Sequence, residues 1–399
     1  MKAADRPLQR PRDAKLLIVD EQGRLAHARR DQLADFFAPG DLVIANDAAT
    51  LPASLHGVHL RSAQKLEVRL AGRRSLRVDD VRAFSAIAFG AGDHRTRTED
   101  RAPPPTLHAG DALQLGPLRA TVLRTLGAPR LIELRFEGLV DAIWAGLARH
   151  GKPIQYAHMR EPLALWDVWT PVAALPVAFE PPSAGFVLDW SQLAQLRARG
   201  VGFATLTHAA GISSTGDAAL DARLPFDEPY HIPASTVRAI ERTRATGGRV
   251  IAIGTTVTRA LEHAAARGRV PRAGDGIADQ RIGEHTRLRV VDALLSGTHE
   301  PGSSHHELLR AFVSDAVLSH IDDALEQRGY LTHEFGDSVL VSRHRAAPKP
   351  ADPPRGDAST ASTDAVVRDV FTPAPAGAGR ETPCTRGTVT QGLSLECAH

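Results

Sequence analysis

Cysteine, aromatic residues and long apolar runs are scarce in this 399-residue chain. Its two cysteines, Cys384 and Cys397, stand in a polar segment near the C-terminus, which argues against a disulfide framework and a cysteine-based zinc site. No apolar run approaches the roughly 18 to 20 residues that span a bilayer, and the N-terminal residues hold no apolar core for secretion. We therefore expect a cytoplasmic protein with no membrane partner.

Several common catalytic motifs are also missing. The chain has no Walker loop, no Gly-x-Gly-x-x-Gly, no zinc-ligand pattern and no Gly-x-Ser-x-Gly elbow. These absences argue against an ordinary nucleotidase, dehydrogenase or hydrolase. Lys and Arg number 48 against 46 Asp and Glu, so a nucleic-acid partner would be bound by local basic patches and not by the overall charge.

The composition fits a globular protein with unstructured ends. Hydrophobic residues make up 43% and charged residues 24% of the chain, and at about 150 residues per domain its length allows two domains or slightly more. Residues 346–399 are dominated by Pro, Ala, Gly, Ser and Thr, with too little apolar surface to offset the entropy of ordering them. We expect a disordered tail there and a flexible N-terminus over residues 1–12.

Two kinds of periodicity divide the rest of the chain. Between 58 and 148, apolar and polar residues alternate with a period of two, as in KLEVRL at 65–70, and turn signals separate the alternating segments. This pattern predicts short antiparallel strands in an inserted β domain. Residues 13–57 and 149–345 alternate strand-like and helical segments, which predicts a discontinuous α/β domain.

Capping residues and apolar spacing place individual elements in the α/β part. We expect helices over 191–199 and 235–246 and strands over 201–206 and 250–253. Apolar residues spaced three and four apart continue from 304 to 325 and predict one long amphipathic helix.

The segment RVIAIGTTVTRALE, residues 249–262, describes a buried strand that stops at Gly254 and turns directly into a helix. Unpaired backbone N–H groups at a helix N-terminus can bind a polar small molecule. Thr255 and Thr256 begin that helix, and Arg259 one turn later could supply a charge-assisted donor. The competing interpretation is that Gly-Thr-Thr merely starts a helix.

Two further segments combine small and polar residues at strand ends or turns. Asn46 and Asp47 follow a buried strand, where α/β proteins bind ligands, although an Asx-turn explains them as well. Ser183, Ala184 and Gly185 form a step of little bulk that would let a ligand approach the backbone, although a plain turn has the same composition.

Histidines in two segments are candidates for acid–base chemistry. His208 ends a strand and is followed by small residues that include Gly211, and histidine is the residue type most often used for acid–base catalysis. A buried structural histidine is the alternative. His299, with His305 and His306, could suggest a metal site, but the spacing fits no metal-ligand signature, so we expect no metal.

Six ordered segments between about residues 38 and 342 resemble the S-adenosylmethionine:tRNA ribosyltransferase-isomerase family of queuosine biosynthesis. They are PGDLVIANDAATLPASLHG, KLEVRL, EPPSAGF, QLRARGVGFATLTHAAG, RVIAIGTTVTRALE and VVDALLSGTHEPGSS. The resemblance implies a barrel-like α/β main domain with an inserted small antiparallel β-barrel domain. It also implies transfer and isomerisation of the ribosyl part of S-adenosylmethionine, the co-substrate, onto 7-aminomethyl-7-deazaguanine in tRNA. In the reaction that the resemblance implies, adenine and methionine are released and no metal is required.

The departures from the family pattern fall at presumed site positions. A basic side chain is missing after Asp47, a family histidine is replaced at Val187, and paired histidines before Glu228 are absent. His208 matches only with the alignment shifted by one position, whereas Glu228 and His299 are retained. The chain therefore resembles a divergent member.

The resemblance assigns roles to the candidate residues. His208, Glu228 and His299 are the catalytic candidates, and the cofactor-binding candidates are Asn46, Asp47, Ser183, Ala184, Gly185, Gly211, Gly254, Thr255, Thr256 and Arg259. Arginines at 73–77 and 95–101 could contact tRNA. Two alternatives stay open, a same-fold enzyme with a non-tRNA small-molecule acceptor and a catalytically silent nucleoside-binding protein. We expect a monomer.

Overall fold

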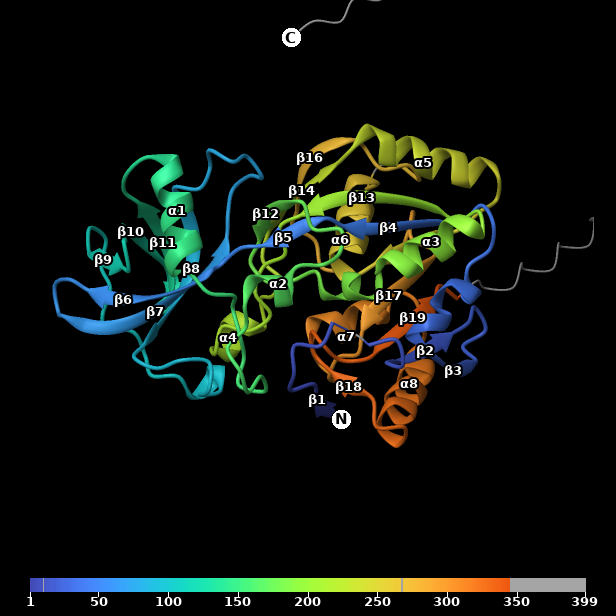
Figure 1. Ribbon diagram of the computed structural model, residues 1–399, viewed down its shortest axis with the longest axis horizontal. Helices are drawn as coiled ribbons and strands as arrows, with labels where there is room; N and C mark the ends of the chain where they lie inside the picture. The colour runs from blue at the N-terminus through green and yellow to red at the C-terminus, as the bar shows by residue number, and fades with distance from the viewer. Residues whose placement is uncertain (10, 267, 345–399) are drawn as a thin grey trace, which may run out of the picture. The chain divides into compact units, whose positions relative to one another are not determined.

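The computed structural model describes residues 1–9, 11–266 and 268–344 (Figure 1). The tail predicted to be disordered, 346–399, lies outside the described residues. None of the described helices is long and apolar enough to cross a membrane.

A nine-stranded mixed sheet forms the centre of the α/β domain. Its strand order is β16-β14-β13-β4-β15-β17-β19-β2-β3, and β13, β4, β15 and β17 pair in parallel. Every residue of β4 and β15 is buried, as expected for parallel strands covered on both faces. The bounds are β2 Lys15–Val19, β3 Leu25–Arg29, β4 Leu42–Asn46, β13 Gly202–His208, β14 Glu228–Ile232, β15 Val250–Ile253, β16 Gly274–Ala278, β17 Ala293–Gly297 and β19 Ser338–Ser342.

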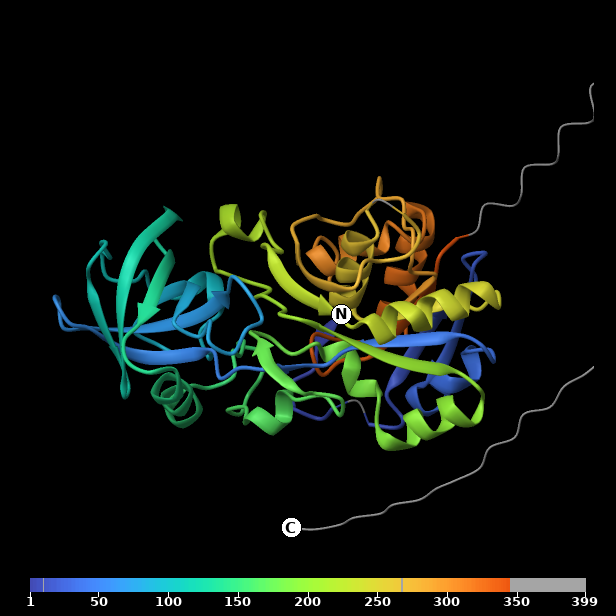
Figure 2. The same cartoon turned by 90° about the horizontal axis from the view of Figure 1, so that it is seen from above.

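Helices cover both faces of this sheet because alternate strand residues point to opposite sides. Ile44 and Ala252 pack with apolar residues of α5, α6, α7 and α8, whereas Val43 and Ile251 pack with η1, η3 and α3. Figure 2 shows α5 and α3 on opposite sides of the strands. The helices are η1 Arg30–Phe36, η3 Ser183–Val187, α3 Trp190–Ala198, α5 Ala234–Ala245, α6 Thr255–Ala264, α7 Ser304–Leu309 and α8 Asp315–Gln327.

The inserted β domain is a closed six-stranded antiparallel barrel with strand order β10-β11-β8-β7-β6-β9, at the left of Figure 1. Its alternating apolar residues, such as Leu66, Val68 and Leu70, are buried in one core cluster that also contains Ile143 and Leu147 of α1. The fold class expected from periodicity and resemblance is thus confirmed. The bounds are β6 Ser54–His59, β7 Gln64–Gly72, β8 Ala83–Gly90, β9 Ala112–Leu115, β10 Leu118–Ala128, β11 Leu131–Phe136 and α1 Val140–His150.

Short elements complete the described chain. Two-stranded parallel pairs join β5 to β12 and β1 to β18. The bounds are β1 Lys2–Ala3, β5 Ala48–Thr50, η2 Thr98–Asp100, α2 Leu165–Val168, β12 Leu175–Ala178, α4 Ala218–Asp221 and β18 Leu331–Thr332.

Two expectations from the sequence need correction. The N-terminus, expected to be flexible over 1–12, begins with a strand, because Ala4 is buried against Met159 and Phe335 and holds β1 beside β18. The single helix expected over 304–325 is two helices, because Ser314 caps a new helix by accepting a hydrogen bond from Val317. Phe312 and Val313, which lie between α7 and α8, are buried, so the apolar spacing continued across the break.

Candidate active site

A cavity of about 300 Å³ opens where β15 and β17 end. The carboxyl edge of a parallel sheet is the usual ligand position in α/β proteins. Segments far apart in the sequence meet in its wall, and nine predicted residues line it: Ser183, Ala184, Gly211, Glu228, Gly254, Thr255, Thr256, Arg259 and His299. Four other predicted residues lie outside the described lining: Asn46, Asp47, Gly185 and His208.

Gly254 makes the turn between β15 and α6 that was predicted from the sequence. Its φ of +98° lies in the left-handed region, which favours glycine, and its N–H donates to Leu295 at 2.8 Å. A Cβ at this position would lie 3.4 Å from the Cβ of Ala184. The N-terminal residues of α6, Thr255 and Thr256, line the cavity directly after the turn.

The guanidinium of Arg259 is buried in the cavity wall and faces protein groups. It forms an ion pair with Glu228 and donates to the carbonyl oxygens of Ala278 and Phe226 at 2.8 and 3.3 Å. Only 4% of Arg259 is exposed. The predicted role of Arg259 as a ligand donor would therefore compete with these contacts.

Glu228 is a buried carboxylate surrounded by donors. Burial by itself would raise its pKa, but the charge of Arg259, together with His208 and the Gly211 N–H, lowers the pKa below its usual range. The Gly211 N–H donates to Oε1 at 2.5 Å, and Nε2 of His208 lies 3.2 Å from Oε2. Glu228 therefore stays ionised near neutral pH, and its carboxylate holds Arg259, His208 and the Gly211 N–H in place.

Asn46 ties the ends of two strands together behind the cavity. Its Oδ1 accepts from the N–H groups of Ala48 and His208 at 3.1 and 2.9 Å, and its Nδ2 donates to the His208 carbonyl at 2.9 Å. The bond to Ala48 is the Asx-turn named above as the alternative. Nδ2 also lies 3.3 Å from Oγ1 of Thr256, so Asn46 supports the wall from outside.

Three other predicted residues are likewise held by protein groups away from the cavity. His208 has no exposed surface and contacts Glu228. Asp47 accepts from the hydroxyl of Thr207 at 2.6 Å, and the Gly185 N–H donates to Pro182 at 2.9 Å within the turn that carries Ser183. These contacts hold His208, Asp47 and Gly185 in the protein around the cavity.

Glu180 lines the cavity but was missed as a candidate. Burial, the larger cause, and the negative charge of Glu334 together raise the pKa of Glu180 to about 7. The hydroxyl of Tyr156 donates to Oε1, and the N–H of Ser213 donates to the same oxygen at 3.0 Å. Its neighbours come from distant segments, so no local sequence signal marks Glu180 as a group that titrates near neutrality.

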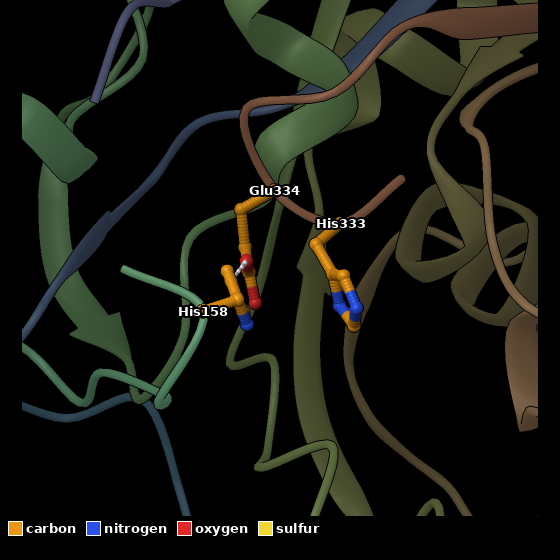
Figure 3. A group of neighbouring side chains, drawn as sticks. All are labelled: His158, His333 and Glu334. Carbon is orange, nitrogen blue, oxygen red and sulfur yellow. Dashed lines mark hydrogen bonds and ion pairs between the residues drawn. The ribbon is translucent and has the colours of Figure 1, made fainter. Parts of the chain in front are cut away.

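His305 forms a second part of the wall that the sequence did not assign. Its ring stacks on His299 with centroids 4.4 Å apart and an interplanar angle of 13°. Burial lowers the pKa of His305, which favours the neutral imidazole. His306, the third histidine of this segment, bonds instead to Asp322 at 3.0 Å. Among the described residues the only group of three potential metal ligands lies elsewhere, at His158, His333 and Glu334 (Figure 3).

A family model described as "Queuosine biosynthesis protein" matches residues 1–341. The chain belongs to this family. The resemblance stated from the sequence is thereby confirmed, and the cavity described above lies within the matched region.

Named relatives of the chain extend over most of its length. It is 33% identical over 355 residues to the S-adenosylmethionine:tRNA ribosyltransferase-isomerase of Azoarcus sp. (strain BH72), covering 86% of this chain and 94% of that protein. The protein of the same name from Acaryochloris marina is 34% identical over 345 residues, covering 83% and 88%. A crystal structure of the S-adenosylmethionine tRNA ribosyltransferase of Thermotoga maritima is 21% identical, with a TM-score of 0.44, and the match covers 85% of this chain and 95% of that chain.

The arginine clusters suggested as a tRNA contact in this family member are largely neutralised. The best-buried of them, Arg101, pairs with Glu67 inside the barrel domain. Arg73 is also buried and donates to a backbone carbonyl. Each of the exposed ones has an acidic partner within 4 Å: Arg74 with Glu133, Arg77 with Asp79, Arg95 with Asp93 and Arg97 with Glu99. Local pairing therefore reduces the positive potential that these clusters present.

Proposed function

We propose that this family member is a S-adenosylmethionine:tRNA ribosyltransferase-isomerase. It transfers and isomerises the ribosyl part of S-adenosylmethionine onto 7-aminomethyl-7-deazaguanine in tRNA and releases adenine and methionine. The observation that carries the proposal is that Gly254, Thr255 and Thr256 line the same cavity as Ser183 and Ala184. The names of the relatives with 33 and 34% identity support this activity.

The co-substrate binds at the N-terminus of α6. Backbone N–H groups there carry partial positive charge and suit the carboxylate or the ribose hydroxyls of S-adenosylmethionine. The small side chain of Ala184 and the turn at Gly254 leave room for the ligand, and the hydroxyls of Thr255 and Thr256 add donors at the same edge.

Glu180 is the proton-transfer group in this proposal. The reaction needs a base for the acidic proton beside the sulfonium, and a pKa of about 7 makes a carboxyl group able to accept and return a proton at neutral pH. Glu228 and His208 then act as positioning residues, since both are held by protein contacts. His299, stacked on His305 in the cavity wall, remains a candidate for contact with the departing adenine. This chemistry requires no metal.

A second candidate is the same chemistry on a small-molecule acceptor. The observation that favours it is the pairing or burial of the arginines at 73–77 and 95–101, because tRNA binding draws on cationic side chains. The two candidates share the cavity and the co-substrate and differ only in the acceptor.

Product analysis separates these functions. The protein is incubated with S-adenosylmethionine, with and without tRNA that carries 7-aminomethyl-7-deazaguanine, beside the Azoarcus relative as a positive control. Adenine and methionine release that depends on this tRNA supports the first candidate. Release without tRNA, or with a cell-extract metabolite fraction, supports the second. No release, with the Azoarcus protein active in parallel, overturns both, and S-adenosylmethionine binding would then indicate a silent homologue.

A further inference from the structure

Two histidines and a glutamate from distant segments lie together near the candidate active site (Figure 3). His158 belongs to the segment between α1 and α2, and His333 and Glu334 to the turn between β18 and β19. One potential ligand atom from each residue lies within 4.8 Å of the other two. Tertiary folding therefore brings three metal-ligating side chains to one point.

The three side chains contact one another and remain partly exposed to solvent. Nε2 of His158 lies 3.2 Å from Oε2 of Glu334, and the rings of His158 and His333 stack with centroids 4.3 Å apart. The side chains are 15%, 20% and 36% exposed for His158, Glu334 and His333. An ion can reach these atoms from solvent while protein surrounds most of the site.

The backbone of the turn holds His333 in an unusual conformation. Its φ of +70° is uncommon for a residue other than glycine. The N–H of His333 donates to Thr298 at 3.2 Å, and its carbonyl accepts from Gly336 at 2.9 Å. Gly336 is itself required, because a Cβ there would lie 2.2 Å from the carbonyl oxygen of Leu331. This arrangement directs the adjacent side chains of His333 and Glu334 toward His158 (Figure 3).

The donor set decides which ions fit. Two imidazole nitrogens and one carboxylate oxygen suit Zn²⁺ and related divalent transition ions, whereas Mg²⁺ and Ca²⁺ prefer oxygen ligands alone. We propose that His158, His333 and Glu334 bind a divalent transition-metal ion of the Zn²⁺ type. Three protein ligands leave a coordination position for water or another small ligand, as in zinc sites of the open kind.

The proposed ion site adjoins the candidate active site. Tyr156, Glu180 and Glu334 line a second small cavity of about 10 Å³, and Glu180 also lines the large one. Glu334 of the proposed ion site and Glu180 of the candidate active site therefore line the same small cavity. The inference does not depend on the proposed function, because ion binding needs neither S-adenosylmethionine nor tRNA.

The test is Zn²⁺ binding to the full chain. Cys384 and Cys397 are replaced by Ser in every protein of the set, because thiolates also bind Zn²⁺. After metal removal, Zn²⁺ is titrated calorimetrically at pH 7.5 and bound metal is counted by elemental analysis. We expect one equivalent per chain, visible d–d bands when Co²⁺ replaces Zn²⁺, and a rise in Tm on metal addition.

Three variants locate the ion. His158→Ala, His333→Ala and Glu334→Gln are each expected to weaken Zn²⁺ affinity at least about tenfold. The matched control is His231→Ala, which removes the histidine of another histidine–carboxylate pair, with Asp275 at 2.6 Å, and should leave the affinity unchanged. Glu334→Gln keeps the shape of the side chain, so this variant tests the site if an alanine variant fails to fold. Absence of stoichiometric binding, or equal affinity in the three variants and the control, overturns the proposal.

Discussion

Tyr156 donates its phenolic hydrogen to the carboxylate of Glu180 at the wall of the candidate active site. The two residues come from different segments, one following the barrel domain and one following β12. Burial and the nearby charge of Glu334 raise the pKa of Glu180 to about 7. A carboxyl group beside a cavity is thereby poised to exchange protons near neutral pH, a property that marks functional sites.

Replacing Glu180 should separate acid–base chemistry from binding. Adenine release by the wild type is expected to rise with pH through about 7, because Glu180 must be ionised to accept a proton. Glu180→Gln should lower the rate by about 10²- to 10⁴-fold and remove that pH dependence. The rate is measured by chromatography of adenine from pH 5.5 to 9, with Glu161→Gln, an exposed glutamate, as the control. An unchanged rate in Glu180→Gln would exclude Glu180 as the base.

The same pKa predicts a pH dependence of stability. Between about pH 4.5 and 7, the folded protein holds a proton on Glu180 that the unfolded chain releases, so the free energy of unfolding falls as pH rises through this window. Glu180→Gln cannot titrate and should gain stability relative to the wild type as pH increases. Urea unfolding at pH 5 and pH 8 measures the difference. If the difference in the free energy of unfolding between the two proteins does not change with pH, the raised pKa is contradicted.

Replacing one partner of the Glu228–Arg259 ion pair should lower the free energy of unfolding strongly. Replacing both partners together should lower it by less than the sum of the two single changes. Glu228→Gln leaves the buried guanidinium without its charge partner, and we expect a loss of about 3–5 kcal/mol. Glu228→Gln with Arg259→Met should lose less than the sum of the single changes, since the pair is removed together. Urea unfolding of the four proteins gives the coupling energy. Strict additivity would show that the pair contributes no coupling.

The lowered pKa of Glu228 gives a further expectation for the same proteins. Its carboxylate stabilises the fold above its ordinary pKa, and this contribution is lost as pH falls through the lowered folded-state value. The stability difference between the wild type and Glu228→Gln should therefore shrink under acidic conditions. Unfolding curves at pH 7 and pH 4 measure it, and a difference that grows on acidification would be the contrary result.

Gly254→Ala should impair both the fold and co-substrate binding. Alanine at a φ of +98° and a ψ of 156° is strained by about 1–3 kcal/mol, and any relaxation moves the first turn of α6, where we place S-adenosylmethionine. Gly247→Ala is the matched control, because Gly247 also has a positive φ, +77°, and a Cβ there meets nothing within 4 Å. Both variants should lose stability, but only Gly254→Ala should weaken S-adenosylmethionine affinity in calorimetry. Equal affinities in the two variants would place the ligand elsewhere.

Asn46→Ala tests whether Asn46 supports the wall or touches the ligand. Removing its amide leaves the buried N–H group of His208 without its partner, whereas the His208 carbonyl still accepts from the Ala210 N–H, and we expect a cost of about 1–3 kcal/mol. Co-substrate affinity, measured by calorimetry at a temperature where the variant is folded, should change little. A large loss of affinity with unchanged stability would instead assign Asn46 to ligand binding.

The sequence by itself determined the architecture and one part of the site. The period-two alternation around 65–70 predicted barrel strands, and the run 250–253 followed by Gly254 predicted a strand, a turn and a helix, because these features depend on neighbours in the chain. The same locality explains the two errors. Nothing near residues 1–12 shows that β18 pairs with Lys2–Ala3, and apolar spacing alone did not show the break that Ser314 makes before α8.

Only the tertiary structure decided what the individual side chains face. Asn46 and His208 end their strands as predicted, yet the Asn46 amide bonds to the His208 backbone and the His208 imidazole faces Glu228. Glu180 became a candidate only through burial beside Tyr156 and the charge of Glu334. Burial, pairing of charges and the meeting of distant segments arise from long-range packing, so local patterns of residues cannot encode them.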